Sequence, residues 1–216
     1  MQSKAYNMSL SLKLTRTANA GVLMEIDGVR ILLDGVCEQL PPYLGTPAYI
    51  RKQLVENMPD VVAFTHKHPD HYDEDYAKSY TLKTLRSVYG PESLPFLEIN
   101  GVEISAYPTR HIGKANIEHI SLVIKGSSTV WFVGDASPLS LKCMEGEDKP
   151  DLLIVPFAYA ITPSAWRMTA SLGAKKILLL HMPPRDNDIE GLWDMVENTV
   201  ESGLYTTLDI GQTINL

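Results

Sequence analysis

The sequence predicts a protein of the α/β (α+β) class. Short apolar runs that end abruptly at a polar residue recur along the 216 residues, and three neighbouring pairs of these runs are separated by tight-turn residues, which is typical of antiparallel hairpins. Segments with apolar residues at helical spacing lie between the strands. Since no stretch has the composition of a linker, we expect a single domain over residues 1–216.

The first expected element is a hairpin. The runs VLMEI (22–26) and RILLD (30–34) flank Asp27 and Gly28, which form a tight-turn dipeptide. This pattern predicts two antiparallel strands near the start of the chain.

Helices and a strand follow this hairpin in alternation. A helix is expected from Pro47 to about Met58, because Thr46 is a favourable N-cap residue and proline is favoured at the first helical position. The apolar run at 61–64 then predicts a buried strand, and a second helix is expected over 72–87.

Two more hairpins are expected in the middle of the chain. In each of them, two apolar runs flank a turn, which is Asn-Gly in the first and Gly-Ser-Ser in the second. The expected strand pairs are 95–99 with 102–107, and 120–124 with 129–133.

The last part of the chain continues this mixture. The expected elements are a strand at 152–157, a helix from Thr162-Pro163 to about Gly173, and a strand at 176–180. Helical spacing predicts another helix that Gly203 closes, with one apolar face made of Ile189, Leu192, Trp193, Val196 and Val200. The final segment, YTTLDIGQTINL (205–216), predicts a last hairpin.

One stretch, FTHKHPDHYD (64–73), holds three of the six histidines and two aspartates. Imidazole and carboxylate groups are good ligands for Zn²⁺-like ions. His66 and His68 leave the strand in an extended stretch, where alternate side chains point the same way, so both rings can bind one ion. Asp70 and His71 follow at the start of the second expected helix and can face a neighbouring ion. The alternative is a solvated polar loop.

Three more ligand-type residues follow the ends of other apolar runs. His111 comes after the strand at 102–107, Asp135 after TVWFV-Gly134, and His181 directly after KILLL. Each of them alone has an ordinary structural interpretation. Together with the stretch after the strand at 61–64, they predict a metal site along one edge of a sheet.

These residues, in this order, resemble the metal-binding motifs of the metallo-β-lactamase-fold superfamily. The resemblance runs from about residue 12 to residue 184, and Asp34 matches the first motif, an aspartate that orients the site from behind the ligands. It implies a four-layer αβ/βα sandwich with two ions between its sheets. The implied ligands are His66, His68 and His111 for one ion, Asp70, His71 and His181 for the other, and Asp135 as the bridge.

The resemblance also implies an enzyme, a metal-dependent hydrolase. Two divalent ions can share a water and lower its pKa toward about 7, which gives a nucleophile at neutral pH. Asp70 would take the proton of the attacking water. Mixed His and Asp ligands favour Zn²⁺, with Mn²⁺ or Fe²⁺ as alternatives.

The expected substrate is a small molecule with an ester-type bond. The compact chain resembles the small UlaG-like members of the superfamily, which implies a lactone or a phosphoester. His119 and Arg110 are candidates for substrate contact, against the alternatives of a structural histidine and an arginine that faces away.

Two other classes of function stay open. One is a ribonuclease Z-like nuclease or phosphodiesterase that acts on nucleic acid, and the other is a non-catalytic metal-binding protein. The net charge of −7 argues against a nucleic-acid partner, and the complete ligand set argues against a non-catalytic protein.

The sequence also leads to an expectation about the location of the protein in the cell. No run approaches the ~20 apolar residues of a membrane span, and the N-terminus lacks the apolar core of a secretory signal. Two cysteines, Cys37 and Cys143, are too few for a disulfide framework. We therefore expect a cytoplasmic protein without a membrane partner; the sequence says nothing about its oligomeric state.

Overall fold

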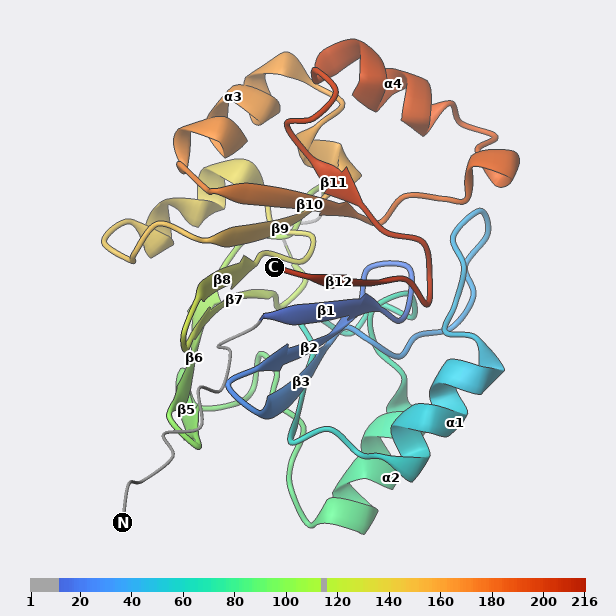
Figure 1. The fold of residues 1–216 in the computed structure, drawn as a ribbon, viewed down its shortest axis with the longest axis vertical. Helices are drawn as coiled ribbons and strands as arrows, with labels where there is room; N and C mark the ends of the chain where they lie inside the picture. Colours follow the sequence, from blue (N-terminus) through green and yellow to red (C-terminus); the bar gives the residue numbers. More distant parts are fainter. Residues whose placement is uncertain (1–11, 114–115) are drawn as a thin grey trace, which may run out of the picture.

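The computed structural model describes residues 12–113 and 116–216. Two β-sheets pack face to face, and helices cover the outer face of each sheet (Figure 1). The layers therefore run helix, sheet, sheet, helix, which confirms the expected four-layer sandwich. Every helix in the described residues is too short or too polar to span a membrane.

The first sheet has five strands in the order β12-β1-β2-β3-β4. Its strands are β1 (Lys13–Arg16), β2 (Val22–Ile26), β3 (Val29–Leu33), β4 (Val61–Ala63) and β12 (Thr213–Asn215). Only the β3–β4 pair is parallel. The helices α1 (Ala48–Glu56) and α2 (Glu74–Thr84) cover its outer face (Figure 1).

The second sheet has seven strands in the order β11-β10-β9-β8-β7-β6-β5. They are β5 (Phe96–Ile99), β6 (Val102–Pro108), β7 (Ile120–Lys125), β8 (Thr129–Phe132), β9 (Leu152–Pro156), β10 (Lys176–Leu180) and β11 (Thr206–Thr207). The strands from β8 to β11 are parallel, and those from β5 to β8 are antiparallel. The outer face is covered by α3 (Pro163–Ser171), α4 (Leu192–Thr199) and the 3₁₀ helices η1 (Pro138–Met144) and η2 (Phe157–Tyr159); η3 (Arg185–Asn187) precedes α4.

The two-residue period of the strands divides the apolar residues between the layers. On β3, Ile31 and Leu33 face the core between the sheets, whereas Leu32 faces the α1 and α2 layer with Val62. The strands β4 and β7 to β10 are buried on both faces, and this is why they appear in the sequence as continuous apolar runs. In β1, β2 and β5 the burial alternates, because one face of each strand is partly exposed.

All three expected hairpins form antiparallel pairs. In the β5–β6 turn, Asn100 and Gly101 have φ angles of 49° and 83°, the left-handed values that a tight hairpin turn requires. The Asn-Gly dipeptide therefore predicted the position of this turn correctly, with Ile99 and Val102 paired on either side of it.

Two helices begin later than expected. Thr46 is not the N-cap of α1, because its hydroxyl accepts a hydrogen bond from the Cys37 N–H, and Pro47 takes the cap position. The second helix begins at Glu74 rather than at residue 72, because the Asp73 carboxylate caps it by accepting from the Tyr76 N–H.

The C-terminal part differs most from the expectation. The helix α4 begins only at Leu192, after Gly191, so Ile189 lies outside it and is 80% exposed. The expected last hairpin is wrong: β11 pairs in parallel with β10, and β12 pairs with β1 of the other sheet. This segment crosses from one sheet to the other because each sheet offers an edge strand for pairing.

Candidate metal centre

The loops that follow four strands converge at one end of the sandwich. Residues 66–71 follow β4 of the first sheet. His111 follows β6, Asp135 follows β8 and His181 follows β10, all of the second sheet. Since these loops come from both sheets, their side chains meet where the two sheets face each other.

The backbone at these loops adopts unusual conformations that aim the side chains inward. His181 has a φ of 63°, and its N–H donates to the Asn19 carbonyl. Gly134 has a φ of 54°, and a Cβ there would lie 2.6 Å from the Thr65 side chain. Positive φ values at non-glycine residues cost free energy and cluster at functional sites. The close packing of Gly134 brings the Asp135 backbone next to the loop after β4.

The first group of ligand atoms comes from three histidines. His66 Nε2 lies 2.9 Å from His68 Nδ1, as the alternation after β4 predicts. The His111 ring centroid is 4.8 Å from that of His66 and 4.9 Å from that of His68. One nitrogen from each of the three rings lies within 4.8 Å of the others, so the three can hold one cation.

The second group contains Asp70, His71 and His181. The Asp70 Oδ2 atom is 3.0 Å from His181 Nε2 and 3.8 Å from His71 Nε2. Ligands at about 2.1 Å from a tetrahedral ion are separated from one another by about 3.4 Å, so these distances suit a single ion. Asp70 and His71 lie in the turn before α2, not at its start, because the N–H of His71 already donates to the His68 carbonyl.

Asp135 lies between the two groups. Its Oδ2 atom is 3.4 Å from His71 Nε2, 3.8 Å from His181 Nε2 and 3.7 Å from His111 Nε2. A single carboxylate oxygen therefore reaches histidines of both groups.

The hydrogen bonds behind the rings leave bare nitrogen atoms that face inward. His66 Nδ1 lies 2.9 Å from the Thr65 hydroxyl, and His111 Nδ1 contacts the Ile112 carbonyl. Among the described residues, the buried Nε2 atoms of His71 and His111 have no hydrogen-bond partner. An outer N–H bonded to an oxygen, with a free lone pair on the inner nitrogen, is the arrangement of metal-binding histidines. The site therefore fits a metal ion.

Asp34 occupies the position that the resemblance implied. Its carboxylate accepts from the Thr65 N–H and hydroxyl, both at 2.7 Å, and lies 2.8 Å from His71 Nδ1. It is buried and orients His71 without joining either ligand group.

The pKa values reflect this crowding of ionisable groups. Burial and the neighbouring His71 hold the pKa of His66 far below its ordinary value. Burial alone would lower the pKa of His71, but the carboxylates of Asp135 and Asp34 outweigh it and raise that pKa well above its usual range. Burial would raise the pKa of Asp135, yet His71 and His181 hold it well below its usual value. The Asp135 carboxylate is therefore ionised at neutral pH.

His119 is buried behind the site rather than exposed to a substrate. Its Nε2 accepts from the Asp135 N–H at 3.1 Å, and its Nδ1 lies 2.8 Å from the Thr109 hydroxyl. Burial lowers its pKa to about 3, so the ring is neutral. Both ring nitrogens are occupied within the protein, which favours the structural alternative.

Arg110 lies at the surface beside His111. Its carbonyl accepts from the Ser137 N–H and the Ser140 hydroxyl, but no contact of its guanidinium with the site is present among the described residues. Its role in substrate contact stays a prediction.

The sequence did not reveal the aromatic wall of the site. The Tyr43 ring packs edge-on against His181, with the ring centroids 4.6 Å apart, and Phe157 lies 5.9 Å from the same histidine. Burial, with the nearby Glu190, Asp135 and Asp70 charges, raises the pKa of Tyr43 to about 12. No strand end or spacing marks Tyr43, because it lies on an irregular loop.

Comparison with protein families gives one match. Residues 13–178 match the model of a β-lactamase superfamily domain. Comparison with curated proteins gives no match.

Several solved structures share the fold. A possible metal-dependent hydrolase from Veillonella parvula has a TM-score of 0.72 at 17% identity, over 95% of this chain and all of the other. An isothiocyanate hydrolase from Delia radicum gut bacteria has a TM-score of 0.66 at 17% identity, over 94% of this chain and 98% of the other. YhfI of Bacillus subtilis, a metallo-β-lactamase fold protein, has a TM-score of 0.61 at 17% identity, over 95% and 99%. At these identities the likeness concerns the fold alone.

Proposed function

Because the chain belongs to the β-lactamase superfamily and has the fold of its metal-dependent hydrolases, we propose that it cleaves a lactone or a phosphoester in a small molecule with two divalent ions. One observation carries this proposal: two groups of ligand atoms lie side by side, and the Asp135 carboxylate reaches both. A dinuclear site with a shared carboxylate is suited to hydrolysis.

The proposed ligands are those of the two groups. One ion would be held by His66, His68 and His111, the other by Asp70, His71 and His181, with Asp135 between them. Imidazole and carboxylate ligands suit Zn²⁺, while Mn²⁺ and Fe²⁺ remain alternatives. When bound, such ions supply a water that is acidic enough to ionise near neutral pH and a Lewis acid for the oxygen of the scissile group.

The chain's own residues supply the proton acceptor. Burial would raise the pKa of Asp70, but the hydrogen bond with His181 and the charges of His71 and His181 together lower it, so this carboxylate is ionised at neutral pH. It is 7% exposed and lies at the centre of the second group. Asp70 is therefore the candidate general base.

The surroundings of the site support a small-molecule substrate. Tyr43 and Phe157 form an apolar wall beside His181. The chain as a whole carries 26 acidic residues against 19 basic ones, which gives little support to the nuclease alternative. The UlaG-like subtype stays a prediction.

A substrate panel tests the proposal. The metal-loaded protein would be assayed on bis(p-nitrophenyl) phosphate, on γ-butyrolactone and on benzyl isothiocyanate, the last because one structural neighbour is named as an isothiocyanate hydrolase. We expect hydrolysis of one of the two esters and a loss of about a hundredfold or more in Asp70→Asn. Asp148→Asn is the matched control, since Asp148 is exposed and pairs with Lys125 at the far end of β7. Turnover of the isothiocyanate alone, or of none of the three, would contradict the proposed bond type.

A further inference from the structure

A buried arginine lies beside the segment that carries His181. Arg16 is the last residue of β1 and is 6% exposed. Burial lowers its pKa to about 10, so the guanidinium is charged at neutral pH. Burying a charge costs free energy unless hydrogen bonds replace its water, so the partners of Arg16 indicate what this charge stabilises.

The guanidinium of Arg16 donates to four backbone carbonyls. Its Nε donates to the Ala18 carbonyl at 3.1 Å, and its Nη1 to the Leu208 carbonyl at 2.7 Å. Its Nη2 donates to the carbonyls of both Asn19 and Met182, at 2.9 Å and 3.0 Å. These carbonyls belong to the loop after β1 and to the segments after β10 and β11, so one side chain joins the first sheet to the second.

Two of these contacts lie on either side of His181. The Asn19 carbonyl accepts from the His181 N–H at 3.1 Å as well as from Arg16, and a carbonyl oxygen has the two lone pairs that this requires. Met182 is the next residue along the chain. His181 has a φ of 63°, a conformation that persists at a non-glycine residue only where its surroundings impose it. Arg16 therefore fixes the peptide groups on both sides of a strained residue.

The imidazole of His181 lacks an outer hydrogen bond that would orient it. Its Nδ1 is buried and has no partner among the described residues, whereas the Nδ1 of His71 lies 2.8 Å from the Asp34 carboxylate. Its Nε2 nevertheless lies 3.0 Å from Asp70 Oδ2. A ring without an outer partner takes its direction from its backbone and from packing, here against Tyr43.

We propose that Arg16 is a positioning residue, whose guanidinium holds His181 in the left-handed conformation that directs Nε2 to the second group of ligand atoms. The inference rests on the proposed function, since it makes Arg16 a determinant of the affinity of the ion that Asp70, His71 and His181 would hold. An arginine that only joined the two sheets would stabilise the fold without distinguishing between the two ions.

Zinc competition with a chelating dye tests the proposal on Arg16→Lys. Lysine keeps the charge, but a single ammonium group cannot reproduce the fork of donors that reaches four carbonyls. We expect the wild type to bind two ions, and Arg16→Lys to bind one of them about 10–100-fold more weakly and the other unchanged. Equal weakening of both ions, or two ions bound as in the wild type, would overturn the role of Arg16.

Double variants identify the affected ion. In a His111→Ala background, which lacks a ligand of the first group, Arg16→Lys should still weaken the ion that remains. In a His181→Ala background it should have no further effect, because Arg16 acts through His181. A further loss in the His181→Ala background would indicate general damage to the fold and would overturn the proposal.

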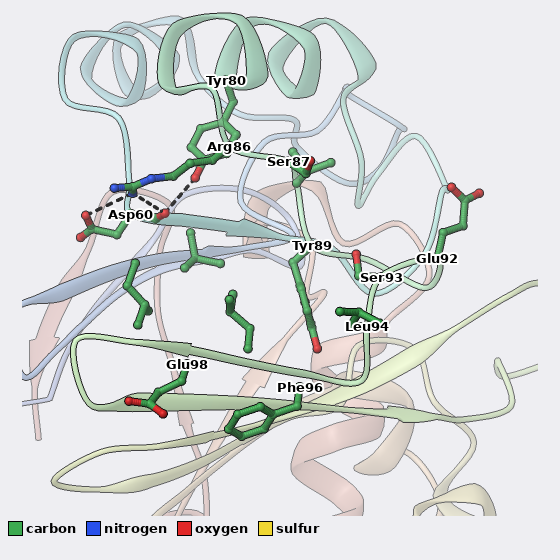
Figure 2. Close-up of a pocket in the computed structure, with 14 residues that line it drawn as sticks. Asp60, Tyr80, Arg86, Ser87, Tyr89, Glu92, Ser93, Leu94, Phe96 and Glu98 are labelled. Carbon is green, nitrogen blue, oxygen red and sulfur yellow. Dashed lines mark hydrogen bonds and ion pairs between the residues drawn. The ribbon is translucent and has the colours of Figure 1, made fainter.

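Tyr80→Phe is the matched control for lost stability. The Asp60 carbonyl accepts from the Tyr80 hydroxyl and from Arg86, each at 2.8 Å, beside a cavity that none of the candidate metal ligands lines (Figure 2). Like Arg16→Lys, this variant removes a donor from a carbonyl that accepts from two groups. It should lower the free energy of unfolding and leave both zinc affinities unchanged, and selective weakening of one ion in Tyr80→Phe would contradict the assignment to Arg16.

Hydrogen exchange on the chelated protein tests the contact without metal. The His181 N–H should exchange about tenfold or more faster in Arg16→Lys than in the wild type, because the Asn19 carbonyl loses its second donor. The Ile112 N–H, which donates to the Asp135 carbonyl, should keep its rate. Equal rates at His181 in the two proteins would overturn the proposal.

The wild type decides the matter even if Arg16→Lys fails to fold. Its His181 N–H should exchange about a hundredfold or more slowly than an unprotected amide, since the backbone on both sides is held. Exchange at the unprotected rate would overturn the role of Arg16. A wild type that binds fewer than two ions would instead overturn the proposed function, whatever the exchange rate at His181.

Discussion

At the scale of single residues, the candidate site depends on side chains that bind no metal themselves. Asp34 accepts three hydrogen bonds, from the backbone and hydroxyl of Thr65 and from His71 Nδ1. Thr65 in turn contacts His66 Nδ1, so one buried carboxylate fixes the orientation of a histidine in each ligand group. Such partners strengthen the basicity of a ligand as well as its position.

The variant Asp34→Asn tests this role. The amide keeps the size of the side chain but removes the negative charge beside His71. We expect zinc affinity, measured by competition with a chelating dye, to fall about 10–100-fold. Asp148→Asn should leave the affinity unchanged, and an unchanged affinity in Asp34→Asn would show that the carboxylate does not support the ligands.

Because His119 is buried and neutral, we expect the metal-free protein to lose stability in acid. Burial lowers its pKa to about 3, against about 6.5 for an unfolded chain. Below about pH 6.5 the His119 imidazole is protonated in the unfolded state but stays neutral in the folded state, so acid favours unfolding. The contribution of the neutral ring to the free energy of unfolding is therefore present above about pH 6.5 and is lost as the pH falls, at about 1.4 kcal/mol per pH unit.

The measurement is urea unfolding of chelated protein at pH 7 and pH 5. His119→Gln should lose about 2 kcal/mol less free energy of unfolding over this interval than the wild type does. His66 titrates in both proteins and therefore cancels in the difference. Equal losses of free energy of unfolding in the two proteins would show that the pKa of His119 is not lowered in the folded state.

At the scale of elements, the ends of strands carry the candidate site, and they are also what the sequence shows most clearly. Apolar runs such as KILLL end where the core ends, so the positions of His181 and Asp135 could be predicted. The conformation of the turns could not. The N-cap of α1 shifted because the Thr46 hydroxyl found a backbone partner 9 residues away in sequence, which no local pattern reveals.

Gly134 links two of these strand ends. A Cβ at this position would lie 2.6 Å from the Thr65 side chain, and the φ of 54° is unfavourable for alanine. We expect Gly134→Ala to lower the free energy of unfolding by about 1–3 kcal/mol and to weaken zinc binding, because Thr65 and Asp135 must move apart.

Gly146→Ala is the matched control for the backbone strain. Gly146 also has a positive φ, 107°, but a Cβ there would meet nothing within 4 Å. Chemical denaturation and zinc competition on both variants separate the effect of an unfavourable φ angle, present in both, from the effect of the steric clash with Thr65, present only in Gly134→Ala. Weakened zinc binding in both, or in neither, would contradict the proposed contact.

At the scale of the whole molecule, the candidate site needs both sheets. The resemblance in the ligand order predicted the sandwich correctly, and the family match agrees with it. The crossing of the last segment from β11 to β12 was missed, because its short strands carry no pattern that distinguishes a hairpin from pairing with two distant edges. The aromatic wall beside His181 was missed for a similar reason: only the packed fold brings the loop that carries Tyr43 to His181.

The core between the sheets is contiguous, which supports the proposal of one domain over residues 1–216. It joins β1 to β4 with β6 to β10 behind the metal centre. We therefore expect the ligand groups to form and to be lost together with the folding of the chain as a unit.

The most direct test of the central claim is the metal content per chain, measured by elemental analysis on zinc-replete protein. The proposed ligand groups predict two ions per wild-type chain and one or none in Asp135→Ala, because the Asp135 carboxylate reaches both groups. A single ion or none in the wild type, or two ions retained in Asp135→Ala, would contradict the dinuclear centre.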